Sequence, residues 1–208
     1  MKFIHRFSVL APIILLVSCA ATQIIQESST DQGIQESSTD WQSLFIDNKL
    51  KQWQIVGDEI WNTQEGMISV TPAETVTFLQ SVKSYDNFHL KLDFWVNDNT
   101  NSGVFFRCTD GAEINPINCY EANIWDNHPN QAFRTGALVT IAEPASHVET
   151  LDKWNSYEII ANGNDITLKV NDQLTSRIQH DKLSSGRIAL QYAGKGMVRF
   201  RNIVIKEL

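Results

Sequence analysis

The segment 101–126, NSGVFFRCTDGAEINPINCYEANIWD, carries polar side chains on two short apolar runs where packing alone would favour hydrophobic residues. Successive side chains of a strand point to opposite faces, so the second run places Glu121, Asn123 and Trp125 together on one face. An acceptor, an amide and an aromatic ring make a lining suited to carbohydrate. Arg107 ends the first run, and pairing it with Glu121 predicts an ion pair beside this lining.

Two cysteines bound the loop between the runs, and their position bears on the strand register. In an oxidising compartment we expect Cys108 and Cys119 to form a disulfide, because no Cys or His stands at zinc-finger spacing from them. A flat hairpin with the two cysteines opposite each other would place Val104 and Phe106, rather than Arg107, beside Glu121. Either a bulge interrupts the strand or one cysteine lies in the loop.

The first 18 residues have a basic start and a short apolar run, which is typical of a secretory signal peptide. Cys19 directly follows that run in a sequence that resembles the bacterial lipobox, so we expect it to carry a lipid; the alternative is a plain signal peptide cleaved near Ala20. Residues 19–40 contain IQESSTD twice and few large apolar side chains, which predicts a flexible tether. The expected location is the envelope of a Gram-negative bacterium, at the outer membrane and facing the periplasm or the surface.

Charge and motifs narrow the classes of partner. The chain has 17 basic and 24 acidic residues; without residues 1–18, 15 basic residues remain and the formal charge is −9. Nucleic acid and anionic lipid surfaces are poor partners for such a chain, so we expect membrane contact only through the N-terminal lipid. The sequence contains no nucleotide-binding glycine loop, zinc-protease motif or serine-hydrolase elbow.

Residues 41–208 predict one all-β domain, because short alternating runs follow one another and none sustains helical spacing. The expected strands are 59–63, 67–70, 75–81, 88–96, 103–107, 120–125, 137–141, 156–162, 165–170, 186–192 and 197–208. In 88–96 apolar and polar residues alternate, which indicates one buried and one solvated face. The predicted architecture is a two-sheet antiparallel jelly-roll sandwich of the concanavalin A type.

Short pieces in order along the chain resemble the 3-keto-disaccharide hydrolase domain family. The pieces are Trp41-Gln-Ser-Leu-Phe, Ile60-Trp61, Asn101-Ser-Gly-Val-Phe-Phe-Arg107, Tyr120–Asp126, Thr135-Gly136, Trp154-Asn155, Gly186–Gln191 and Phe200-Arg-Asn-Ile. The resemblance covers essentially all of 41–208 and implies a concanavalin-like or laminin-G-like sandwich. The chain departs from the family pattern at Asn123, where glutamine is usual, and at Tyr192-Ala193, where many relatives have a histidine.

The resemblance implies an enzyme that cleaves 3-keto-glycosides such as 3-keto-disaccharides. A ketone at C3 acidifies the hydrogen at C2, so a base can remove that proton and the enolate can expel the C1 substituent. Glu121 is the first candidate for base or metal ligand, His128 is the second and His147 is a weaker third. Arg107 is the candidate cation that holds the carbonyl oxygen or orients Glu121, unless the two form only a structural ion pair. The alternative for the whole domain is a non-catalytic, lectin-like envelope lipoprotein that binds a glycan.

The remaining candidate positions are binding residues. Trp125 and Asn123 suit stacking and hydroxyl recognition, whereas Asn101 either reads a hydroxyl or belongs to the turn before Gly103. Gly136 lets the chain pass close to a ligand or makes an ordinary turn. Asp126 caps its strand or helps bind a divalent ion; no cofactor is assigned, and a metal ion is left open.

Overall fold

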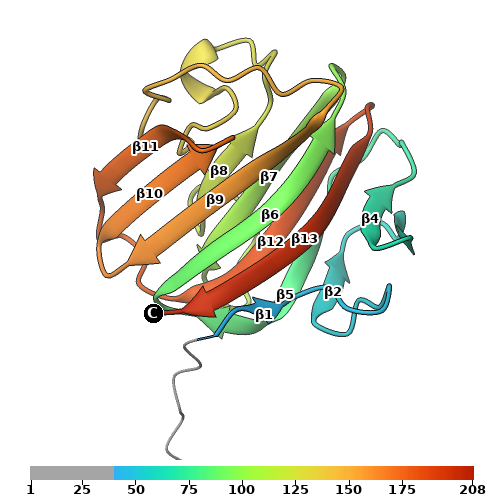
Figure 1. Cartoon of the computed structure of the whole chain (residues 1–208), viewed down its shortest axis with the longest axis horizontal. Coiled ribbons are helices and arrows are strands. Elements are labelled where there is room, and N and C mark those ends of the chain that lie inside the picture. The colour runs from blue at the N-terminus through green and yellow to red at the C-terminus, as the bar shows by residue number, and fades with distance from the viewer. Residues whose placement is uncertain (1–39) are drawn as a thin grey trace, which may run out of the picture. The chain divides into compact units, whose positions relative to one another are not determined.

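The computed structural model describes residues 40–208, which fold into two antiparallel β-sheets packed face to face (Figure 1). The predictions of a signal peptide over 1–18, a lipid on Cys19 and a tether over 19–40 fall, apart from Asp40, outside the described residues. No helix within residues 40–208 is long and apolar enough to cross a bilayer.

Thirteen strands and one 3₁₀ turn make up the domain. The bounds are β1 Gln42–Ser43, β2 Trp53–Val56, β3 Trp61–Gln64, β4 Met67–Val70, β5 Thr77–Tyr85, β6 Phe88–Val96, β7 Thr100–Cys108, β8 Tyr120–Ile124, η1 Gln131–Phe133, β9 Trp154–Asn162, β10 Asp165–Val170, β11 Gln173–Gln179, β12 Gly186–Gly194 and β13 Val198–Glu207. The larger sheet has eight strands in the order β11-β10-β9-β6-β13-β4-β3, with β1 beside β13; the smaller sheet has five, in the order β2-β5-β12-β7-β8. The larger sheet lies in front in Figure 1. This architecture confirms the predicted jelly-roll sandwich.

Alternation along each strand decides which side chains enter the core. In β6 the side chains of Phe88, Leu90, Leu92 and Phe94 are at most 2 % exposed, and those between them are wholly or partly open to solvent. The rings of Phe88 and Phe106 meet edge to face between the two sheets, with centroids 5.9 Å apart. Each such side chain contributes about 1.5–3 kcal/mol on burial. The core therefore fixes the two sheets and leaves the outer face of each available for binding.

The predicted strand over 137–141 is wrong. Leu138 makes only single bridges to Ala122 and Ala142, and Thr140 has a φ of 64°, which is incompatible with an extended strand. Two strands that alternation does not predict, β2 and β11, are edge strands of the two sheets. Edge strands have one unpaired side and tolerate polar residues, so their sequences carry a weak apolar signal.

A β-bulge interrupts β7 close to the disulfide loop. Two residues of β7, Phe106 and Arg107, oppose one residue of β12, and Arg107 has a φ of 50°. The extra residue shifts the alternation, so Phe105 and Cys108 both lie on the outward side of the sheet. The bulge explains how the disulfide and the strand register fit together. Phe105, and not Arg107, lies directly opposite Glu121.

Candidate functional site: a groove on the smaller sheet

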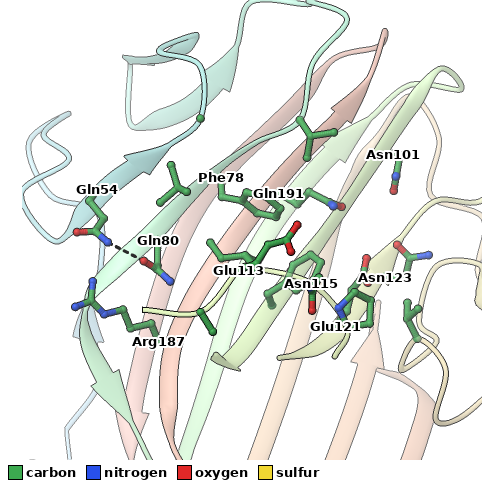
Figure 2. Close-up of a pocket in the computed structure, with 18 of the residues that line it drawn as sticks. Gln54, Phe78, Gln80, Asn101, Glu113, Asn115, Glu121, Asn123, Arg187 and Gln191 are labelled. Carbon is green, nitrogen blue, oxygen red and sulfur yellow. Dashed lines mark hydrogen bonds between the residues drawn. The ribbon is translucent and has the colours of Figure 1, made fainter. Parts of the chain in front are cut away.

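The outward face of the five-stranded sheet carries a groove of about 980 Å³ (Figure 2). Strand register arranges its floor in two rows that cross the sheet from β2 to β8. The rows are Gln54-Gln80-Ala189-Phe105-Glu121 and Val56-Phe78-Gln191-Gly103-Asn123. The small residues Ala189 and Gly103 lie inside the rows, so the floor is lower at these two positions than at their larger neighbours.

Glu121 is the buried acid of the groove. Its side chain lies over Gly103 and is only 8 % exposed. Among residues 40–208 no hydrogen bond or ion pair reaches its carboxyl group, so nothing offsets the loss of water around the charge. Burial raises the pKa of Glu121 to about 7. A carboxyl group with this pKa exchanges protons readily near neutral pH.

Gln191 is an unpartnered amide of the floor, in the row next to that of Glu121. It is 8 % exposed, and its Oε1 atom has no hydrogen-bond partner in the described residues. Gln191 pairs with Gly103 across the strands, and Gly103 in turn underlies Glu121. Buried polar atoms are nearly always hydrogen-bonded, so a free amide at the floor of a groove indicates a ligand-binding position.

Four further predicted binding or catalytic residues line the same end of the groove as Glu121: Asn101, Asn123, Trp125 and His128. The His128 ring lies edge-on to Trp125, at 4.4 Å between centroids, and its Nδ1 accepts a hydrogen bond of 3.0 Å from the Asn130 backbone. The proton of a neutral His128 is therefore on Nε2, which makes the ring a donor rather than a base at that atom.

The amide of Asn123 is largely committed to the fold. Its Nδ2 donates to the Phe133 carbonyl, and its Oδ1 accepts from the Ile124 backbone at 3.0 Å. The bond to Phe133 holds η1 against β8, and one N–H of the amide remains for a ligand. Asn101 has no comparable side-chain bond and is the freer amide.

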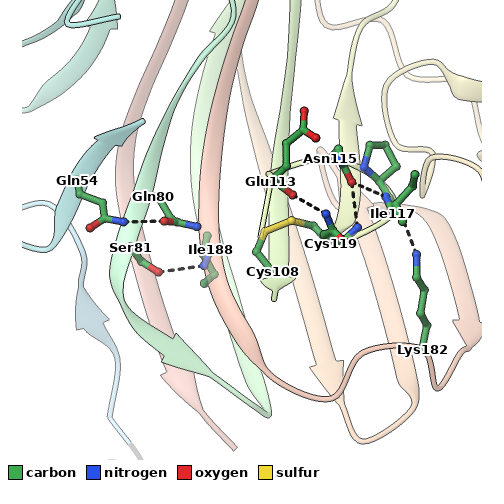
Figure 3. Close-up of a disulfide and its surroundings, with 12 residues drawn as sticks. Gln54, Gln80, Ser81, Cys108, Glu113, Asn115, Ile117, Cys119, Lys182 and Ile188 are labelled. Atoms are coloured by element: carbon green, nitrogen blue, oxygen red, sulfur yellow. Dashed lines mark hydrogen bonds between the residues drawn. A yellow bond between two sulfur atoms is a disulfide. The ribbon is translucent and has the colours of Figure 1, made fainter. Parts of the chain in front are cut away.

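The disulfide loop forms one wall of the groove. Cys108 and Cys119 are bonded as predicted, and the loop between them lines the groove from Asp110 to Pro116 (Figure 3). The side-chain oxygen of Asn115 accepts from two backbone N–H groups in the loop, which stabilises its turn. Figure 2 shows the Glu113 carboxylate extending from this loop over the floor. The wall is thus covalently fixed to the strands that carry Phe105 and Glu121.

The far end of the groove is polar but already paired. Gln54 donates to Gln80 Oε1 at 2.7 Å, and Arg187 Nε lies 3.1 Å from Asp110 Oδ1. Three strand spacings separate Gln80 from Glu121, roughly 14 Å. The groove therefore extends beyond what one sugar ring would occupy.

The predicted ion pair between Arg107 and Glu121 is wrong. The bulge turns the Arg107 side chain away from the groove, and the guanidinium group donates to the backbone carbonyls of Asp86, Gly163 and Leu183 at 2.8–3.1 Å. Arg107 is 1 % exposed and does not line the groove. It joins three turns at one end of the sandwich, so the structure gives it a stabilising role in place of the expected contact with substrate.

Three other predicted positions also lie outside the groove lining. Gly136 has a φ of 88°, and the Thr175 side chain occupies the space where a β-carbon would lie, so glycine is required for chain packing. Both carboxylate oxygens of Asp126 accept from Thr150, through its backbone N–H at 2.6 Å and its hydroxyl at 2.8 Å. His147 is exposed on a separate loop. Residues 40–208 contain no group of three or more His, Cys, Asp or Glu placed to hold a metal ion.

Sequence reasoning missed the contributions of β5 and β12. Gln80, Arg187 and Gln191 belong to strands whose predicted spans were correct in outline. In β12, Arg187, Ala189 and Gln191 alternate with buried Ile188 and Leu190, so this pattern already marked an outward polar row. Which sheet that row belonged to depended on long-range pairing, and the sequence alone does not give it.

A concave, polar groove on the smaller sheet of a jelly-roll sandwich is a form suited to binding carbohydrate. Residues 40–206 match the family described as the 3-keto-alpha-glucoside-1,2-lyase-like domain, and the chain belongs to that family. No curated protein matches the sequence.

Solved structures share the fold. A protein from Parabacteroides distasonis assigned as a glycosyl hydrolase superposes with a TM-score of 0.70 at 25 % identity, over 81 % of this chain and 100 % of that one. A second from the same organism gives 0.72 at 20 % identity, over 81 % and 94 %. The carbohydrate-binding module CBM66 from Bacillus subtilis gives 0.59 at 19 % identity, over 75 % and 96 %.

Proposed function

We propose that the groove binds a 3-keto-glycoside and that Glu121 removes the proton at C2. The observation that carries the proposal is the carboxyl group of Glu121, which is buried, has no partner in the described residues and has a pKa raised to about 7. At that pKa the group is a stronger base than an ordinary carboxylate, and its protonated form is populated near neutral pH.

The reaction proceeds by elimination. Glu121 takes the proton from C2, and the C–H electron pair forms an enolate with the C3 carbonyl oxygen. The enolate collapses to the ketone, forms a double bond between C1 and C2 and expels the C1 oxygen, which receives a proton. Water added across the double bond then completes a net hydrolysis. To the amides of Gln191 and Asn101, which both line the groove, we assign donation to the enolate oxygen, the role first given to Arg107.

A non-catalytic glycan-binding role is the second candidate, supported by the fold it shares with CBM66 and by the length of the groove. In both cases we propose that the protein is exported and held at a bacterial envelope through a lipid on Cys19. The groove would then meet glycans outside the cytoplasm.

The test compares a 3-keto-disaccharide with its unoxidised parent, with and without a chelator, following sugar release and enone absorbance. We expect release from the keto sugar alone, and chelator sensitivity would reveal a metal requirement. Glu121→Gln should abolish release while keeping most of the affinity; Glu143→Gln, which neutralises an exposed acid outside the groove, is the matched control. Binding without release in the unmodified protein would support the glycan-binding role and exclude the catalytic one.

A further inference from the structure

The outward face of the eight-stranded sheet is positively charged although the chain is acidic overall. Strand register brings six basic and three acidic side chains onto it: Lys91, Lys169, Arg177, Arg199, Arg201 and Lys206, with Asp93, Glu158 and Asp165. We call this surface the basic face. The formal charge of the whole chain is −7, yet the topology gathers an excess of positive charge on the side of the sandwich opposite the groove.

Tryptophan side chains order the cations of the basic face. The Arg199 guanidinium lies 4.8 Å from the centroid of the Trp95 ring, and that of Arg201 lies 3.9 Å from Trp154. Trp95 and Trp154 are themselves paired across neighbouring strands. An arginine stacked on an indole keeps its edge N–H groups available and loses little conformational entropy when it binds a planar anion.

Part of this positive charge is not neutralised within the fold. Glu158 is bonded to His89, Lys91 and Lys169, and Asp93 to Arg201, so those groups satisfy one another. By contrast, no carboxylate of residues 40–208 forms an ion pair with the other three basic side chains. These are Arg177, Arg199 and Lys206, which lie on β11 and β13.

We propose that the basic face is a second binding surface and that it takes an anionic polysaccharide, a glycan chain bearing carboxylate or sulfate groups. Guanidinium groups form bidentate hydrogen bonds with such oxygens, and cations spread over several strands match charges repeated along a polymer. The large exposed apolar side chains at this face are Trp41 and Leu174, which is little apolar area for insertion into a bilayer. The balance of charged and apolar groups therefore favours a glycan over a lipid surface.

The test measures binding of the purified protein to polygalacturonate and to its methyl ester, which has the same backbone without the charge. Dextran sulfate and dextran make the corresponding sulfated pair, and phosphatidylglycerol vesicles test the lipid surface. The triple variant Arg177→Gln, Arg199→Gln, Lys206→Gln removes the unneutralised cations. The control triple variant Lys49→Gln, Lys51→Gln, Lys195→Gln removes the same charge from exposed positions outside the basic face.

We expect salt-sensitive binding to polygalacturonate, to dextran sulfate or to both, and no binding to the methyl ester or to dextran. Binding to polygalacturonate would indicate recognition of carboxylate groups, and binding to dextran sulfate would indicate recognition of sulfate groups. The triple variant should weaken this binding about tenfold and the control should not, since only the first removes cations from the basic face. Glu121→Gln should leave it unchanged, so failure of the proposed catalysis does not affect the result. The proposal would be overturned by equal loss of binding in both triple variants or by no binding at all. Binding to the neutral polymers alone, or to the vesicles alone, would overturn it as well.

Discussion

The carboxylate of Glu121 lies over the backbone of Gly103, with its Oε1 3.3 Å from the position that a β-carbon on residue 103 would occupy. The absence of a side chain at residue 103 therefore leaves room for the Glu121 carboxyl group. This contact also explains why Glu121 is buried without a polar partner, because the acid lies against the backbone of β7 instead of reaching solvent.

Gly103→Val should displace Glu121 and reduce kcat more than tenfold, since the new side chain would occupy the space of the carboxylate. The fold should survive because residue 103 faces outward. Thermal unfolding checks the fold, and the pH dependence of kcat/KM checks the mechanism: displacement toward solvent should move its midpoint below 7. An unchanged midpoint would show that Glu121 does not set the pH dependence.

The rate of the proposed elimination should rise with pH through about 7. The base acts in its ionised form, and burial raises the pKa of Glu121 to about 7, so activity is lost as pH falls below that value. A profile of kcat/KM against pH measures this directly. A rising limb near 4.5, the ordinary value for a glutamate, would contradict the assignment.

Glu121 should also make the protein less stable at pH 7 and above than at pH 4.5. Its pKa is raised on folding, so the native state favours the protonated form; stability is retained below about 4.5 and lost as pH rises through about 7. The stability difference between the unmodified protein and Glu121→Gln should change by up to roughly 3 kcal/mol over that interval, in favour of the variant at high pH. Denaturant unfolding at several pH values tests this, and a constant difference would exclude it.

Arg107→Lys should destabilise the protein by about 3 kcal/mol or more, because an ammonium group cannot reach the carbonyls of Asp86, Gly163 and Leu183 together. Activity per folded molecule should be nearly unchanged. Active-site titration combined with denaturant unfolding separates the two effects. A large loss of turnover in fully folded protein would restore the catalytic role that the geometry argues against.

Replacing both Cys108 and Cys119 with serine should cost roughly 3 kcal/mol of stability, from the chain entropy of a loop with a sequence separation of 11. Glycan affinity should fall as well, because the wall from Asp110 to Pro116 would lose its covalent attachment. Calorimetry of unfolding and of ligand binding provides both measurements. Unchanged affinity would mean that the other contacts of the loop are sufficient to hold the wall.

The alternation of apolar and polar residues in the sequence predicts most of the strands of this fold but fewer of the residues that line the groove. The alternation of β6 and β12 predicts strands because it records which residues face the core. The same alternation places Glu121 and Asn123 on one face correctly. It fails for Arg107, because a bulge reverses parity and depends on a backbone φ that composition does not reveal. It also cannot place Gln80 and Gln191 in the same groove as Glu121, since that arrangement arises from pairing among strands far apart in sequence.

The bulge in β7 also determines how this chain can be aligned with related sequences. It inserts one residue between Phe105, which lies in the groove floor, and Cys108, which fixes the loop wall. In a chain one residue shorter at this point, a regular strand would already place the floor position and the cysteine two residues apart on the same outward face. Such a homologue could keep both the floor and the disulfide without a bulge, whereas a chain of the present length that lost the bulge would turn one of the two into the core, so a one-residue gap here is compatible with the same groove.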